Sequence, residues 1–354
     1  MHRSKILTVV LMVALFSVAA GAAERSDGKP KYPSLKVGGF GDFNLEVSNE
    51  ANPDSPSGFE NGQFVLHFVS PLSKSISFFS EVTVNAKDEE FTIEIERMFV
   101  KFDYNDNLKV AFGRFHTPIN WWNTAFHHGA WLQTTITRPE MTRFGGEFIP
   151  VHFVGGIAQG SIPSGGLNLS YEAGVGNGRH ENIGRPGDAG DINDSRAWLV
   201  RLTSKPNKPF GLQFGASYYD DKISPEIGED YDEQIAGAFV VYPRETPEVI
   251  AEYTHLEREG LETGESFDSD SYYVQVAYRL PVWKARLKPY ARYEEIDVAD
   301  GEPVFVSQTD REGYTVGLRL DIWNYVAVKV EYRHQRSNND PYVNAGFAQL
   351  SFAF

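Results

Sequence analysis

Strict alternation of apolar and polar side chains constrains this chain more than any other feature. From Leu35 onward, segments of about ten residues place an apolar side chain at every second position. Residues 272–280 are the clearest case, because Tyr272 and Val274 alternate with Tyr273 and Gln275. Successive side chains of an extended strand point to opposite sides, so each segment has an apolar face and a polar face. The pattern predicts an all-β fold.

The polar face decides which all-β fold is expected. Lys329 and Glu331 lie at mid-strand between Val328, Val330 and Tyr332, and other segments repeat this arrangement. A soluble protein of this size would cover that face with a second apolar layer, but the sequence contains no amphipathic helices to supply one. Lipid offers no hydrogen-bond partners to a strand edge, so a spanning sheet must close. We therefore expect a transmembrane antiparallel β-barrel that is apolar outside and polar inside.

The connections between these segments alternate in length. The long polar connections are residues 48–61, 116–144, 177–194, 220–232 and 257–270, whereas residues 71–74 and 105–107 form tight turns. Long extracellular loops on one rim and short periplasmic turns on the other are typical of outer-membrane barrels. Counting with this rule predicts about 16 strands, and a barrel of that width encloses a water-filled lumen.

The first 22 residues have the pattern of a secretory signal peptide. Arg3 and Lys5 precede an apolar run, and Ala20-Gly21-Ala22 is a small-x-small cleavage site. A single membrane anchor is the alternative, but the apolar run is short for a span. We expect residues 1–22 to be the signal peptide, residues 23–34 a short periplasmic segment and residues 35–354 the barrel.

Charge and cysteine content exclude several functions. Cleavage after Ala22 takes the net charge from −15 to −17, and an acidic chain is a poor partner for nucleic acid. The absence of Cys excludes disulfides and thiolate metal sites. Gly-x-Ser-x-Gly and His-Glu-x-x-His motifs are missing, so we expect no enzyme activity and no cofactor.

A change of parity marks one strand. Ile93 and Ile95 occupy odd positions, whereas Met98 and Val100 occupy even ones, which predicts a β-bulge at Glu96-Arg97 that turns both charges inward. A misplaced strand boundary would explain the same pattern. The residues predicted to line the pore are Glu96, Arg97, Lys101, Lys109, Arg201, Arg279, Arg292, Arg319, Lys329 and Arg333. Acidic residues also point inward by parity, namely Asp42, Glu46, Glu81, Asp103, Glu172, Glu294, Asp321 and Glu331.

Two parts of the sequence resemble a known family. Residues 97–102 (RMFVKF) and 107–115 (NLKVAFGRF), followed by Thr117-Pro118 and Trp122-Asn123, are similar to the core motif of outer-membrane porins near the phosphate-selective O and P type. The C-terminal residues Leu350, Phe352 and Phe354 resemble the signal read by the outer-membrane assembly machinery. The resemblance implies passive diffusion through a trimeric barrel. Phosphate selectivity is not carried over, because the chain is acidic and its predicted lumen is mixed in charge.

The connection 116–144 is the third outward loop, and in general porins this loop folds into the barrel and narrows it. Its 29 residues are long for an idle connection. The residues predicted to form the constriction are Asn120, Trp121, Trp122, His127, His128, Arg138, Glu140 and Arg143. The tryptophans either stack on sugars or pack the loop on the wall, and the charged residues either filter solutes or pair locally. His127 and His128 are adjacent and would point apart on an extended chain, so no metal site is expected.

The sequence therefore predicts a porin of the Gram-negative outer membrane that passes small solutes or ions. Its acidic outer loops favour a mild cation preference and contact with lipopolysaccharide. A carbohydrate-specific porin that uses the loop tryptophans is one alternative. A non-conducting structural or adhesive barrel is the other.

Overall fold

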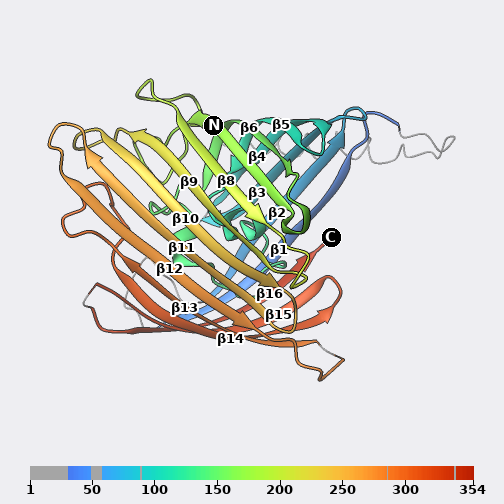
Figure 1. Ribbon diagram of the computed structural model, residues 1–354. Coiled ribbons are helices and arrows are strands. Elements are labelled where there is room, and N and C mark those ends of the chain that lie inside the picture. Colours follow the sequence, from blue (N-terminus) through green and yellow to red (C-terminus); the bar gives the residue numbers. More distant parts are fainter. Residues whose placement is uncertain (1–30, 49–57, 88–89, 285, 339) are drawn as a thin grey trace, which may run out of the picture.

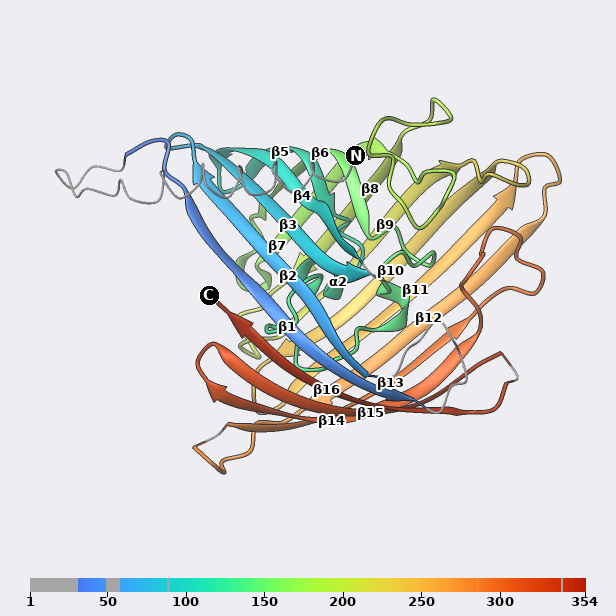
Figure 2. The same cartoon turned by 180° about the vertical axis from the view of Figure 1, so that it is seen from behind.

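The computed structural model describes residues 31–48, 58–87, 90–284, 286–338 and 340–354. Sixteen antiparallel strands form one closed barrel, shown from two sides in Figures 1 and 2. Each strand pairs with the next along the chain, and β1 pairs with β16 to close the ring. The predicted fold class and strand count are confirmed. The predicted signal peptide and most of the segment 23–34 lie outside the described residues.

The strands are 8 to 16 residues long, enough to cross a bilayer when tilted. The first eight are β1 (Lys36–Ser48), β2 (Gly58–Pro71), β3 (Ile76–Lys87), β4 (Glu90–Asn105), β5 (Leu108–His116), β6 (His152–Ile162), β7 (Leu169–Asn177) and β8 (Ala197–Ser204). The other eight are β9 (Gln213–Ile223), β10 (Tyr231–Pro243), β11 (Glu248–Gly260), β12 (Ser266–Ala277), β13 (Leu287–Asp297), β14 (Arg311–Trp323), β15 (Val326–Ser337) and β16 (Val343–Ala353). The helical segments are α2 (Trp122–Phe126), η1 (Glu140–Thr142) and η2 (Gly165–Leu167). Among the described residues, no helix is both long and apolar enough to cross a membrane.

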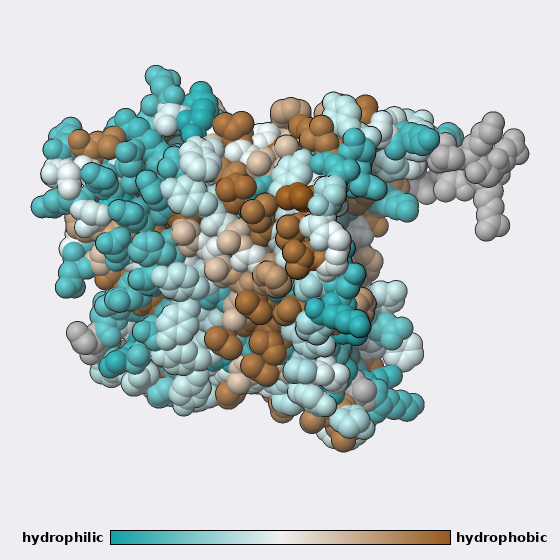
Figure 3. Space-filling view, viewed as in Figure 1, coloured by the Kyte–Doolittle hydropathy of each residue, from teal (hydrophilic) through white to brown (hydrophobic). Residues whose placement is uncertain are grey.

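The two faces of the wall differ as the alternation predicts. On β12, Tyr272, Val274 and Val276 are exposed on the outside, whereas Tyr273 and Gln275 are buried on the inside. Figure 3 shows apolar side chains in a band across the barrel wall, with polar side chains towards both ends. An outer face of this kind matches the hydrocarbon layer of a membrane.

The predicted bulge in β4 is confirmed. Arg97 lies opposite Glu81 on β3 and Ile95 lies opposite Val82, so Glu96 is an extra residue. Both charged side chains point inward. Arg97 donates a hydrogen bond to Glu81 (Nε–Oε2, 2.5 Å), and Thr83 donates one to Glu96 (Oγ1–Oε1, 3.1 Å).

Two predicted outer loops are shorter than expected. The connection between β11 and β12 is only residues 261–265, because Arg258 and Phe267 are still paired within the sheet. Likewise β9 runs on to Ile223 and β10 begins at Tyr231. Their acidic side chains indicated loops, but water at the rim solvates charges on a strand equally well. The sequence pattern therefore could not separate the hairpin end from a loop.

Candidate functional site

The connection between β5 and β6, residues 117–151, lies inside the barrel and is called loop 3 below. Figure 2 shows its helix α2 within the ring of strands. The Asn120 backbone N–H donates to Ser217 Oγ on β9 (3.1 Å), and the Asn120 amide donates to Thr254 Oγ1 on β11 (2.7 Å). Ser217 and Thr254 are buried on the inner face. Loop 3 therefore packs against the wall opposite β1–β4.

Inward carboxylates of the wall accept hydrogen bonds from the loop backbone. Glu252 on β11 accepts the N–H groups of Trp121 and Trp122 through Oε1, at 2.8 and 2.7 Å. Glu331 on β15 accepts the N–H groups of Ile136 and Thr137, at 2.8 and 3.0 Å. Hydrogen bonds to charged groups are about twice as strong as neutral ones. These two carboxylates hold both halves of the loop.

Inward cations of the wall bind the carbonyl groups of the same loop. Arg201 donates to Asn120 O (2.6 Å), and Arg292 donates to Thr137 O (2.9 Å). Arg319 donates to the carbonyls of Trp131 and Gln133, at 2.8 and 2.9 Å. Lys329 donates to Thr135 O at 3.0 Å.

These bonds correct part of the predicted pore lining. Arg201, Arg292, Arg319 and Lys329 do point inward, but loop 3 covers all four and they are buried. Their side chains donate hydrogen bonds to carbonyl groups of the loop backbone. Those carbonyl groups need such partners because the loop is mostly neither helix nor strand. They fasten the loop and do not face a solute.

Apolar contacts complete the attachment. Ile119 and Phe148 of loop 3 share one buried cluster with Ile235, Phe239 and other inward residues of β10 and β11. The sequence interpretation missed these inward apolar positions, since it assumed a polar inner face. A signal was present, because residues 235–242 form a nearly unbroken apolar run, which is typical of a strand covered on both faces.

The tryptophans predicted for the constriction pack within the protein. Trp122 is buried beneath the Arg138 guanidinium, which lies 4.9 Å from its ring centre. Trp121 packs edge-on against Phe126 at 5.1 Å. Trp131 stacks on Phe40 of β1 at 6.4 Å. Trp121 and Trp122 also pack in the cluster that joins the loop to the wall, so wall packing, the second of the two alternatives, describes these contacts.

Of the other predicted loop residues, His127, His128 and Arg138 border the space away from the anchoring strands, whereas Glu140 and Arg143 lie beside β13 and β14. Arg138 also lies 3.6 Å above the Phe144 ring, and burial lowers its pKa to about 9. Burial also lowers the pKa of His127 well below its usual value, so this ring is neutral at pH 7. Arg143 forms an ion pair with Glu140 (3.3 Å), which is the predicted local pair.

The remaining predicted residues occupy three different places. Lys101 and Lys109 are half-buried near Asp103, at 3.8 and 3.9 Å. Arg279 lies beyond the end of β12 and pairs with Glu245 and Asp321 near the short turns, at 2.5 and 2.6 Å. The last of the lining residues is Arg333, which lies over the Phe347 ring at 4.9 Å. The proposed assembly residues Leu350, Phe352 and Phe354 fall on the last strand or directly after it.

A cavity of about 640 Å³ remains between loop 3 and the opposite wall. Its lining from the wall is mainly polar and comes from β1–β6 and β16, and the loop contributes His127, His128, Arg138 and Phe144. The charged wall and loop groups around it are Asp42, Glu46, Glu60, Glu94, Glu96, Arg114, Arg138 and Arg185. Arg185 and Arg114 pair with Glu94 and Asp188, respectively. Carboxylates therefore exceed guanidinium groups beside this space.

Comparison with known structures gives the fold its context. The chain is similar to an anion-selective porin from Comamonas acidovorans (13% identity, TM-score 0.66, covering 91% of this chain and 100% of that one). The chain has the porin fold. It is also similar to the outer-membrane channel DcaP of Acinetobacter baumannii (12%, 0.62, 93% and 100%) and to OmpT of Vibrio cholerae in a trimer form (14%, 0.61, 92% and 100%). No protein-family model and no curated protein matches the sequence.

Proposed function

We propose that this chain is an outer-membrane porin that lets small hydrophilic solutes or ions diffuse through a water-filled channel narrowed by loop 3. The observation that carries the proposal is that one side of the wall holds the backbone of this loop. Its backbone is hydrogen-bonded to β8, β9, β11 and β13–β15, while a polar cavity stays open towards β1–β4 and β16. A loop held in this way narrows a lumen without filling it.

The charge around the cavity supports a mild cation preference. Asp42 and Glu60 border the space from neighbouring strands, and within the described part of the chain the donors to Asp42 are neutral, namely the Asn44 amide and the Gln63 N–H. Fixed negative charge at a constriction raises the local concentration of cations. The acidic connections at the long-loop rim add to this effect.

The proposal includes the chain's location and partners. The predicted signal peptide would export it to the bacterial outer membrane, where the exposed apolar band meets lipid and the acidic rim meets lipopolysaccharide. The last strand would carry the signal for the assembly machinery. A homotrimer is proposed because the motif resemblance implies one and because one similar structure is described as a trimer. Membership of the phosphate-selective superfamily stays a prediction, and no enzymatic role is proposed.

Planar-bilayer recording tests this function. Full-length protein refolded in detergent is added to one side of a bilayer in symmetric KCl, and then in a KCl gradient. We expect stepwise current increases and a reversal potential of the sign that cations produce. Protein that inserts, as shown by protection from protease, but passes no current would overturn the channel proposal. A reversal potential of the anion sign would show that the guanidinium groups dominate the constriction.

A further inference from the structure

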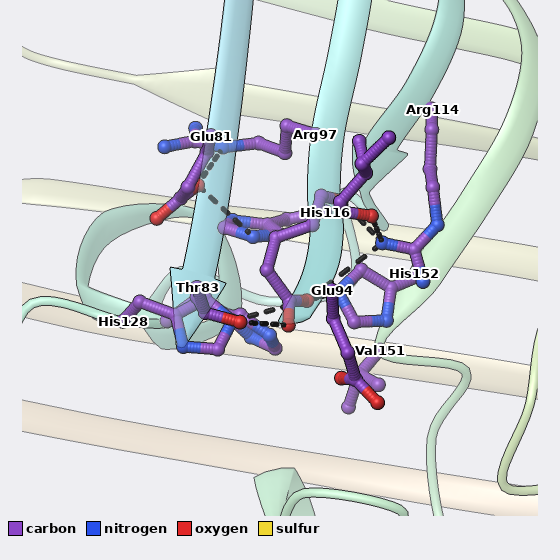
Figure 4. A network of polar contacts seen from close by, with 12 residues as sticks. Glu81, Thr83, Glu94, Arg97, Arg114, His116, His128, Val151 and His152 are labelled. Carbon is purple, nitrogen blue, oxygen red and sulfur yellow. Dashed lines mark hydrogen bonds and ion pairs between the residues drawn. The ribbon is translucent and has the colours of Figure 1, made fainter. Parts of the chain in front are cut away.

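Four histidines meet where loop 3 joins the wall. His116 ends β5, His152 begins β6, and the two are paired across the sheet. His127 and His128 follow α2 and return to the same place. One ring nitrogen from each of the four histidines lies within 4.8 Å of the corresponding nitrogens of the other three. Figure 4 shows His116, His128 and His152 gathered beside Glu81 and Thr83, and we call the set of four the four-histidine cluster.

The cluster is buried, and its ring nitrogens are short of partners. His116, His127 and His128 are 5%, 4% and 4% exposed. The Nε2 atoms of His116 and His127 are buried and lack a hydrogen-bond partner among the described residues, whereas those of His128 and His152 face a carboxylate. A buried polar atom without a partner costs about 1–3 kcal/mol, so two in one cluster call for an explanation.

Hydrogen bonds outside the cluster orient two of its rings. The Asn123 amide donates to the carbonyls of Thr117 and Val151, both at 3.0 Å, so its oxygen faces His127 Nδ1 at 2.9 Å and accepts that proton. His128 Nδ1 lies 3.0 Å from Gln63 Oε1 and is oriented in the same way. The Nε2 atom of His127 then carries a free lone pair, whereas that of His128 faces Glu96 Oε2 at 3.1 Å. Metal-binding histidines usually donate their other N–H to such an acceptor.

A carboxylate lies beside the four rings. Glu96 Oε2 is 2.8 Å from His152 Nε2 and 3.1 Å from His128 Nε2. Glu81 Oε2 is 3.6 Å from His116 Nε2. These two acids offset the charge of an added cation, whereas Arg138, whose Nη2 is 3.2 Å from His127 Nδ1, opposes it. The bulge in β4 is what brings Glu96 inward to this position.

We propose that the four-histidine cluster binds one divalent transition-metal ion of the zinc class. Four imidazoles suit zinc, nickel and copper, and tetrahedral zinc with bonds of about 2.0–2.1 Å needs nitrogens about 3.3 Å apart. The present spread of up to 4.8 Å requires the ring nitrogens to move inward by about an ångström when the ion binds. The ligands come from β5, β6 and the middle of loop 3. The ion would therefore hold the middle of the loop close to the two strands that the loop connects.

This inference departs from the sequence prediction of no metal site. That prediction assumed an extended chain at His127-His128, which would point the rings apart. The premise is wrong, because the segment leaves α2 in a helical turn and the two ring centres are 4.4 Å apart. The inference does not require that the barrel conducts.

Metal binding by the purified chain tests the site directly. Full-length refolded protein, freed of any affinity tag and of metal by a chelator, is dialysed against zinc and analysed for metal content, and Co²⁺ is titrated while visible absorption is followed. We expect one ion per chain and the intense bands of four-coordinate cobalt. His128→Gln and His152→Gln should each weaken binding at least ten-fold. His334→Gln, which removes an outward histidine of β15, is the matched control and should bind like the wild type.

Two results would overturn the site. One is zinc content well below one ion per chain, and the other is unchanged affinity in both cluster variants. If the variants do not refold, judged by heat-modifiable migration on gels, X-ray absorption of the zinc-loaded wild type decides. Scattering from several imidazoles supports the site, whereas a shell of oxygen ligands contradicts it.

Discussion

The inner wall of this barrel has two sides. Both follow the same alternation of apolar and polar residues, but their inward side chains have different roles. On the anchored side, β8–β15, inward Arg, Lys and Glu residues bind the backbone of loop 3 and are buried. On the open side, β1–β4 with β16, inward acids border the cavity. The comparison teaches that inward parity alone does not make a residue part of the pore. What lies opposite the side chain decides its role.

The largest expected effect is on a tryptophan in the buried cluster that joins loop 3 to the anchored side. Trp122→Ala should cost about 3–5 kcal/mol of unfolding free energy, because the ring is 1% exposed. Trp283→Ala is the control, since Trp283 is 68% exposed and its loss should change stability by less than about 0.5 kcal/mol. Urea unfolding followed by gel mobility measures both. Unchanged stability together with loss of sugar block in bilayers would assign Trp122 to solute binding instead.

The next comparison replaces one carboxylate on each side and measures the change in unfolding free energy. Glu331→Leu should cost about 2–5 kcal/mol, because two loop N–H groups and the Tyr290 hydroxyl lose their acceptor. The freed loop should also make single-channel current noisier. Glu60→Leu on the open side should leave stability nearly unchanged. Equal stability loss in the two variants would erase the distinction between the sides.

A lysine pair gives a smaller contrast. Lys329→Met leaves the Ala130 and Thr135 carbonyls without their donor and should cost about 1–3 kcal/mol. Lys101→Met removes only a half-exposed ion pair with Asp103 and should cost less than about 1 kcal/mol. Thermal unfolding in detergent compares them. A larger loss for Lys101→Met would argue against the anchoring role of Lys329.

The smallest expected effect is on selectivity. Glu60→Gln should lower the cation-to-anion permeability ratio roughly two-fold, because one charge among several sets the local potential. Reversal potentials in a KCl gradient measure the ratio. The matched change on the anchored side, Glu252→Gln, should leave the permeability ratio unchanged. A larger change of the ratio in Glu252→Gln than in Glu60→Gln would contradict an ion path along the open side.

Much of the architecture could be predicted from local patterns. Alternation identified the strands, connection lengths gave their number, and the parity change at Glu96-Arg97 marked the bulge that the register confirms. These signals are local because a strand's faces and a bulge depend only on neighbouring residues. The strand ends at the acidic rim were not predicted correctly. Charged residues there indicate exposure to water, and they do not show where the hydrogen-bonded strand pairs end.

The attachment of loop 3 could not be predicted in the same way. Its bonds join residues far apart in sequence, such as Trp121 with Glu252 and Ile136 with Glu331. Such contacts between a side chain and a distant backbone leave no motif, because any residue supplies a carbonyl. The four-histidine cluster is similar, since His152 lies 24 positions beyond His128 and only the pairing of β5 with β6 unites the ends.

Single-cysteine accessibility during bilayer recording tests the central claim most directly, and the absence of native Cys gives a clean background. Glu60→Cys places a thiol beside the cavity, and Thr254→Cys places one on the inner wall beneath Asn120. A charged methanethiosulfonate reagent should reduce the current of Glu60→Cys channels within minutes and leave Thr254→Cys channels unchanged. Rapid block of Thr254→Cys with no effect on Glu60→Cys would contradict the account.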